Sequence, residues 1–198
     1  KISGIKIPTI PWVIATELVT CWKNTSQVEP FASSCAVMSA RFKPLPTPTT
    51  MGVPTAPNHS IRAECHREVF AEHEGIKVVA EGIDNDSIEI AQQQAAAIMQ
   101  AHPNLKGWVA SDAAGPIGIG QAIIEAGKQD QVTLVGLDNL PEMLDMIRSG
   151  VADSSSASQP ELQGYWSVML LWAQATGAPV PQYLDTGNAF LTKDNVDG

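Results

Sequence analysis

The chain has 198 residues, a formal net charge of -9 and a hydrophobic content of 44%. This length allows one good core or two small lobes, and the composition is that of a folded protein. The acidic excess argues against DNA, RNA or an anionic membrane surface as the main partner, and the longest apolar run, residues 166–173, is too short to span a bilayer.

The first 60 residues differ in composition from the rest of the chain. They contain eight of the 14 prolines, and basic residues outnumber acidic ones there. Proline removes a backbone donor and disfavours helix in the residue before it. We therefore expect residues 42–60 to be extended or irregular, and we interpret 1–60 as an irregular Pro-rich segment.

From residue 61 onwards, helical and strand patterns alternate. Residues 61–158 predict one α/β lobe, and residues 159–198 predict a crossover helix with terminal strands. Short crossovers of this kind give a parallel sheet, so the fold class is α/β with helices on a parallel sheet. The expected helices are 61–75, 87–102, 116–127, 141–150 and 160–177, and the expected strands are 76–82, 107–111, 131–138 and 151–158.

Polar side chains follow each expected strand. Because ligands of open parallel sheets bind outside the carboxyl ends of the strands, these residues are candidates for binding a small polyol or sugar. Helix capping and turn formation favour the same residue types, so each one alone has two explanations. The candidates are Asp84, Asn85, Asp86, Ser111, Asp112, Asp138, Asn139 and Gln159.

Two other groups of residues suggest chemistry only weakly. Gly115, Gly118 and Gly120 could cradle a phosphate, but no phosphate-loop motif is present, which favours close helix packing. Cys65 and His66 could contribute to a metal site, but they lack a metal-binding spacing, and a solvated helix face explains them better. We therefore expect no metal and no cofactor.

Catalysis has little support in the sequence. Asp112 and Asp138 could form a carboxylate pair, as in a glycosidase, but nothing in their spacing sets the distance between them. Tyr165, Trp166 and Trp172 lie on or beside the apolar stripe of one helix, which favours a core position over a sugar platform. A carbohydrate-active enzyme therefore remains the less favoured alternative.

Residues 61–198 resemble the carboxyl-terminal part of type I periplasmic binding proteins, the sugar-binding components of bacterial ABC transporters. The matching stretches, in order, are GIKVVAEGIDND, AHPNLKGWVASDAAG, QAIIEAGKQDQVTLVGLD, SASQPELQGYW and LDTGNAFLTKDNVD. The ligand-sensing domains of LacI-type regulators share this lobe and remain an alternative. The ending LDTGNAFLTKDNVD is more similar to a transport protein.

The resemblance implies a sugar enclosed between two lobes, delivery to a transporter permease, and a periplasmic or extracellular location, although no signal peptide is visible. Carried over by position, Asp138, Gln159, Asp112 and Ser111 match ligand-binding positions of the family. Asn85 lies near a position that is often aromatic. A ligand arginine is expected just before residue 65, and Arg62 is nearby but not clearly assigned.

The resemblance does not extend through residues 1–60, so the first lobe is expected to be largely missing. The apolar stripe of the helix 160–177 would then have no sheet to cover it. One hypothesis is that residues 1 to about 60 are a frameshifted translation. Reading codons allowed for residues 11–38 one nucleotide earlier can give an amphipathic helix, a turn and a buried strand. The nucleotide sequence of the gene tests this hypothesis.

Overall fold

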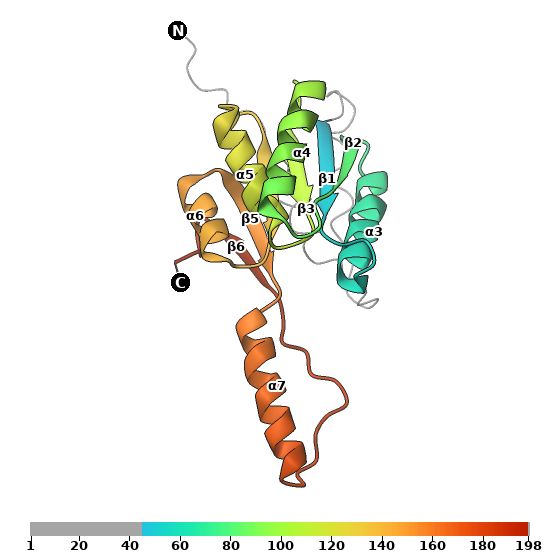
Figure 1. The fold of residues 1–198 in the computed structure, drawn as a ribbon, viewed down its shortest axis with the longest axis vertical. Helices are drawn as coiled ribbons and strands as arrows, with labels where there is room; N and C mark the ends of the chain where they lie inside the picture. Colours follow the sequence, from blue (N-terminus) through green and yellow to red (C-terminus); the bar gives the residue numbers. More distant parts are fainter. Residues whose placement is uncertain (1–44, 198) are drawn as a thin grey trace.

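Strands and helices alternate along residues 45–197, the part of the chain that the computed structural model describes (Figure 1). Most of the elements expected from the sequence are present, with ends that differ by a few residues. In chain order they are β1 (Leu45–Met51), α3 (Pro57–Glu72), β2 (Ile76–Ile83), α4 (Ile88–Ala101), β3 (Gly107–Ala110), α5 (Gly115–Glu125), β4 (Thr133–Leu137), α6 (Pro141–Ser149), β5 (Ala152–Ala157), α7 (Pro160–Ala175) and β6 (Ala189–Thr192).

The strands form one six-stranded sheet with the order β2-β1-β3-β4-β5-β6. Neighbouring strands from β2 to β5 are parallel, which confirms the predicted α/β class, and β6 pairs with β5 in the antiparallel direction. The carboxyl ends of the five parallel strands therefore lie along a single edge of the sheet.

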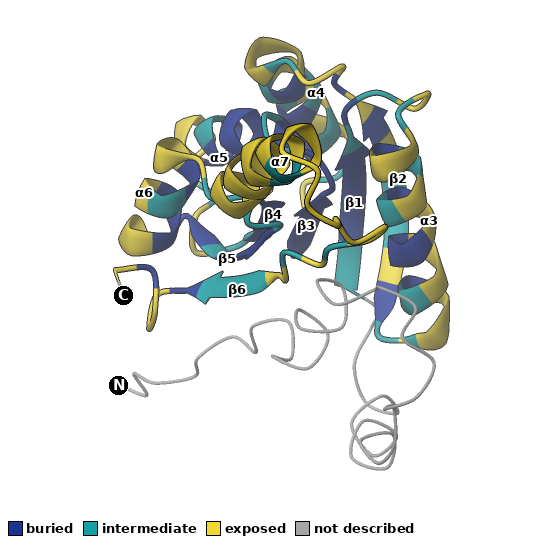
Figure 2. Cartoon of the chain, turned by 90° about the horizontal axis from the view of Figure 1, so that it is seen from below, coloured by how far each residue is buried: buried dark blue, intermediate teal, exposed yellow. Residues whose placement is uncertain are grey.

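Both faces of the central strands are buried. Successive side chains of a strand point to opposite faces of the sheet, and here each face packs on a core of its own. Trp108 of β3 belongs to the larger core, together with apolar residues of α4, α5 and α6. The next residue, Val109, belongs to a smaller core with Phe70 of α3 and Val135 of β4. Figure 2 shows α4, α5 and α6 grouped on one side, with α3 beside β1 and β2.

The lobe starts earlier than the predicted boundary at residue 61. Strand β1 is extended, as expected, but it is a regular member of the sheet between β2 and β3, and α3 already begins at Pro57. A parallel strand accommodates Pro48 because the register shifts between Thr47 and Thr49, where a ladder hydrogen bond is not required. Pro57 fits the first helical turn, where its missing N–H has no intrahelical role. The frameshift hypothesis falls largely on residues 1–44, outside the described part.

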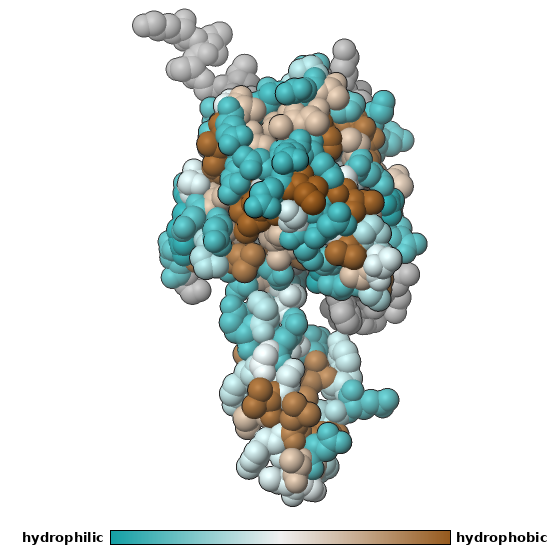
Figure 3. All heavy atoms as spheres, in the orientation of Figure 1, coloured by the Kyte–Doolittle hydropathy of each residue, from teal (hydrophilic) through white to brown (hydrophobic). Residues whose placement is uncertain are grey.

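Helix α7 projects away from the sheet, and the segment 176–188 then leads the chain back to it (Figure 1). It contains no buried residue. Figure 3 shows its apolar side chains as brown surface. The apolar stripe of α7 is therefore exposed, as expected in the absence of a covering sheet. The core position expected for the aromatic residues is wrong, because α7 leaves the sheet instead of packing on it. The exposed fractions are 42% for Leu162, 56% for Tyr165, 39% for Trp166, 65% for Val168, 36% for Met169 and 62% for Trp172.

Within residues 45–197, no helix is both long and apolar enough to cross a membrane.

Candidate ligand site at the carboxyl edge of the sheet

The direction in which successive strands are added to the sheet reverses between β1 and β3. From β1 the chain passes to β2 on one side and then crosses to β3 on the other. In open α/β sheets the crevice outside the carboxyl ends at such a point is the usual ligand site. The turns that follow β1, β2 and β3 meet there, so the structure brings their polar residues together.

Two buried carboxyl groups lie at this point, one after β2 and one after β3. The side chains of Asp84 and Asp112 are both 0% exposed. Asp84 Oδ1 accepts a hydrogen bond from the Asp86 N–H at 3.0 Å, and Asp112 Oδ2 accepts one from the Gly115 N–H at 2.6 Å. Asp112, predicted as a ligand residue, thus lies below the surface and holds the start of α5.

Burial also changes the acidity of these groups. Desolvation, followed by the charge of Asp112, raises the pKa of Asp84 to about 7. Desolvation is also the largest cause that raises the pKa of Asp112, and the N–H of Gly115 opposes it. The site therefore contains an acidic group that titrates near neutral pH.

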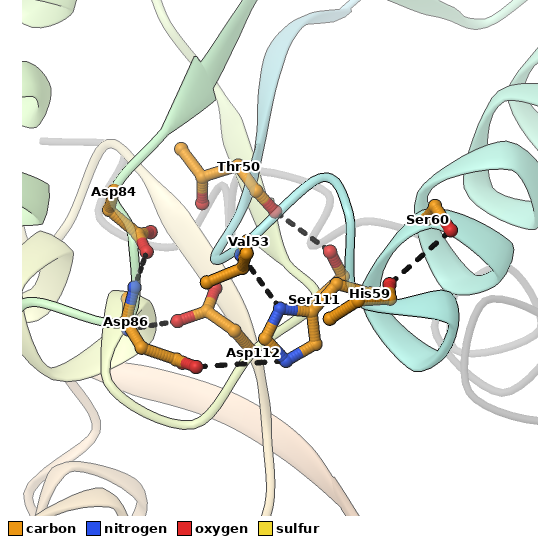
Figure 4. A network of polar contacts seen from close by, with 10 residues as sticks. Thr50, Val53, His59, Ser60, Asp84, Asp86, Ser111 and Asp112 are labelled. Carbon is orange, nitrogen blue, oxygen red and sulfur yellow. Dashed lines mark hydrogen bonds and ion pairs between the residues drawn. The ribbon is translucent and has the colours of Figure 1, made fainter.

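Backbone and side-chain contacts connect the turn after β1 to the same point (Figure 4). Ser111, a predicted ligand residue, donates its hydroxyl to the Thr50 carbonyl at 3.0 Å and is fully buried. His59 of α3 accepts the Val53 N–H on Nδ1 at 2.8 Å, and its Nε2 lies 3.8 Å from Asp86 Oδ2. Ser111 therefore ties the end of β3 to β1, and His59 ties the turn after β1 to α3.

A second group of polar residues follows β4 and β5. Asp138 is half-buried, and its Oδ1 accepts a hydrogen bond from the Ser158 hydroxyl at 2.9 Å. The Asp138 carbonyl accepts another from the Ser155 hydroxyl at 2.6 Å. Gln159, the next residue after Ser158, is half-buried and precedes α7, and its side chain does not cap that helix. Asp138 and Gln159 are therefore neighbours at the same edge.

The backbone at this edge is strained. In the described part of the chain, the four non-glycine residues with positive φ are Asn85 (56°), Asp86 (58°), Asp138 (64°) and Gln159 (58°). All four are among the residues that the sequence makes candidates for binding. Left-handed conformations at non-glycine residues cluster at ligand sites, where the surrounding structure holds them.

An open groove of about 1260 Å³ extends from β3 and β4 to α3, α7 and the returning segment. Arg62 of α3 lines it, as do Ser158, which donates to Asp138, and Asn188. Its lining does not include Asn85, Ser111, Asp112, Asp138 or Gln159. The five residues named from the family resemblance thus share one edge but form two groups. Asn85, Ser111 and Asp112 lie near the end of β1, and Asp138 and Gln159 lie beside the groove.

Sequence reasoning missed several contributors to this site. Thr50 lies in the proline-rich segment, and His59 lies in the first turn of α3, which begins earlier than expected. Because residues 42–60 were expected to be extended or irregular, neither residue was predicted to belong to the site. The solvated face expected for Cys65 and His66 is wrong, because both are buried, at 6% and 7% exposure. The only available signal was the register of α3, which places His59, His66 and Phe70 on the side facing the sheet.

Comparison with known proteins places this lobe in a family. A family model described as "Periplasmic binding protein domain" matches residues 17–179. The D-allose-binding periplasmic protein of Escherichia coli K12 is 30% identical over 131 residues, which are 65% of this chain and 41% of that protein.

Solved structures show the same fold. An ABC transporter periplasmic solute-binding protein from Actinobacillus succinogenes 130z, with bound D-allose, aligns with a TM-score of 0.76 and 20% identity over 93% of this chain and 59% of that one. A sugar-binding protein of a sugar ABC transporter from Bacillus halodurans aligns with a TM-score of 0.69 and 25% identity over 83% of this chain and 61% of that one.

The matches span less than half of the curated relative and less than two thirds of either structure. The family model covers most of the chain, and the fold is similar to that of the solved relatives. The chain therefore belongs to the periplasmic binding protein family.

Proposed function

We propose that this chain binds a sugar or sugar-like polyol, as a solute-binding protein or as the second lobe of one. The observation that supports this proposal best is the gathering of short polar side chains, on a strained backbone, at one edge of the parallel sheet. Family membership and the sugar-binding relatives support it further. Nothing in the described residues favours the regulatory domain over this function.

The chemistry of the edge suits a ligand with several hydroxyl groups. Asp138 keeps carboxylate lone pairs that can accept ligand hydroxyls, because only one side-chain donor, Ser158, contacts it in the described part of the chain. The amide of Gln159 both donates and accepts. Arg62 lines the groove and offers donors for hydroxyl or ring oxygens. We propose Asp138 and Gln159 as ligand contacts, with Arg62 as a further one.

The remaining predicted residues take supporting places in this proposal. Ser111 and Asp112 are buried and bonded within the protein, so they shape the turns beneath the ligand. Asn85 is exposed on the strained turn after β2, where it can reach a ligand from the side. Binding without chemical turnover, followed by delivery to an ABC transporter permease in the periplasm, completes the proposal.

Thermal unfolding of the full chain with separate sugars tests this function. A ligand present at 100 times its Kd stabilises the folded state by about 2.7 kcal/mol. For a chain of this size, that is a rise in Tm of roughly 5–10 °C. We expect such a rise with at least one of D-allose, D-ribose and D-xylose, and none with alanine.

Variants then locate the site. Asp138→Asn keeps a residue that tolerates positive φ, removes the charge, and should weaken binding at least tenfold, because hydrogen bonds to charged groups contribute about 1.5–3 kcal/mol. Gln159→Ala should weaken it less. Asp130→Asn, an exposed change at the opposite edge, is the control. Equal affinity of Asp138→Asn and Asp130→Asn would remove Asp138 from the site.

A further inference from the structure

The pair of buried carboxyl groups after β2 and β3 has an unusual arrangement. Asp84 Oδ2 and Asp112 Oδ1 are both buried and accept no hydrogen bond in the described part of the chain. Each lies 2.6 Å from the position that a Cβ atom on Gly115 would occupy. The two oxygens therefore face the same small space, which exists because residue 115 has no side chain.

The other oxygen of each group is already bonded. Asp84 Oδ1 accepts the Asp86 N–H, and Asp112 Oδ2 accepts the Gly115 N–H. Each carboxyl is thus anchored through one oxygen, and its other oxygen lies at the space beside Gly115. Because neither can rotate away without losing a backbone hydrogen bond, their proximity is built into the two turns.

Among the residues that the structure describes, no lysine or arginine acts on the pKa of either carboxyl. The charged or titratable groups facing the pair are Asp86, on the turn of Asp84, and His59, from α3. His59 accepts the Val53 N–H on Nδ1 and directs Nε2 to Asp86, at 3.8 Å. The neighbours from β1 and α5 are Thr50 and the backbone of Gly115, which are uncharged.

Two ionised carboxylates that are buried together are strongly unfavourable, whereas one proton between them removes a charge and supplies the missing donor. We propose that Asp84 and Asp112 share one proton, and that this proton ties the turn between β2 and α4 to the start of α5. The pair is a pH-sensitive latch at the carboxyl edge of the sheet. It holds the turn that carries Asn85 and Asp86, and it requires no sugar.

The latch works in a defined pH range. Burial and the neighbouring carboxylate raise the pKa of Asp84 to about 7, well above the value of 3.8 for an unperturbed aspartate. Between these values the folded chain keeps a proton that the unfolded chain has lost. Stability therefore falls as the pH rises through this range and levels off above about 7. With one proton of difference, the unfolding equilibrium constant rises up to tenfold per pH unit.

The first test measures urea unfolding of the full chain, without sugar, from pH 5 to pH 8.5. We expect Asp84→Asn to flatten the dependence of unfolding on pH, because an asparagine amide can donate to Asp112 at every pH. The control Asp130→Asn, an exposed carboxylate at the opposite edge, should keep the wild-type slope. His59 is unchanged in all three proteins. Equal slopes for Asp84→Asn and Asp130→Asn would overturn the proposal.

The second test needs no variant and remains decisive if Asp84→Asn does not fold. With ¹³C-labelled aspartate, the carboxyl resonances of the wild-type chain report each titration. We expect one carboxyl of the pair to titrate near pH 7, with a matching response of the other, since coupled groups lose protons as a pair. Titration of both carboxyls below pH 5 would show two separate carboxylates and refute the latch. Neither test depends on the proposed sugar binding.

Discussion

Substitution of Gly118 in α5 should destabilise the fold, because α4 approaches α5 closely at this residue. A Cβ atom on this residue would overlap the carbonyl oxygen of Ile88 and lie 2.8 Å from Ala91 Cβ and 2.9 Å from Gln92 N. Two of these three atoms belong to the backbone of α4, which cannot rotate away as a side chain can. Gly118→Ala must therefore push α4 and α5 apart.

The magnitude follows from two opposing effects. Alanine in a helix interior is favoured over glycine by about 1 kcal/mol. Overpacking costs typically about 1–3 kcal/mol and more where the backbone must move. Separating the helices also loosens Ala91 and Ala95, which are 1% and 0% exposed. We expect a net loss of about 1–3 kcal/mol, or a fall in Tm of roughly 2–10 °C.

Urea unfolding followed by circular dichroism measures this loss. The matched control is Gly75→Ala, because a Cβ on Gly75 meets nothing within 4 Å and its φ is not positive. That control should change stability by less than about 0.5 kcal/mol, or raise it slightly by restricting the unfolded chain. If Gly118→Ala proved as stable as Gly75→Ala, the close packing inferred for α4 and α5 would be wrong.

Two further predictions concern the surface. The exposed apolar face of α7 should make the chain self-associate, since burying one large apolar side chain contributes about 1.5–3 kcal/mol. Light scattering should show masses above 21.1 kDa that rise with protein concentration, and Trp172→Ser should lower these masses whereas Gln174→Ala should not. A mass of 21.1 kDa at every concentration would refute this prediction. The exposed Arg67–Glu81 pair, at 2.7 Å and 2.8 Å, lowers the pKa of Glu81 through the Arg67 hydrogen bond. Its stabilisation is present above the unfolded pKa and lost as the pH falls through the folded one. Glu81→Gln should therefore cost only about 0.2–1 kcal/mol at pH 7 and progressively less at acidic pH, and a larger loss by urea unfolding would contradict this.

Much of the fold from residue 61 onwards could be predicted from local sequence. Helix α6 shows why: Pro141 suits its first turn, and Gly150 adopts φ 81° at its end. Apolar runs such as that of β4 need burial on both faces, which a parallel sheet with helices provides. The polar residues after the strands then had to meet at one edge, because parallel strands all end on the same side.

The strand order and its consequences came only from the tertiary structure. The sequence indicated extended or irregular chain for residues 42–60, yet β1 lies inside the sheet between β2 and β3, and its pairing with β2 shifts register beside Pro48. Asp84 and Asp112 are 28 residues apart and looked like separate strand-end groups. They meet because β2 and β3 lie on either side of β1, and because Gly115 leaves room for both carboxyls. Such a contact depends on which strands are neighbours, and no local pattern of residues specifies that order.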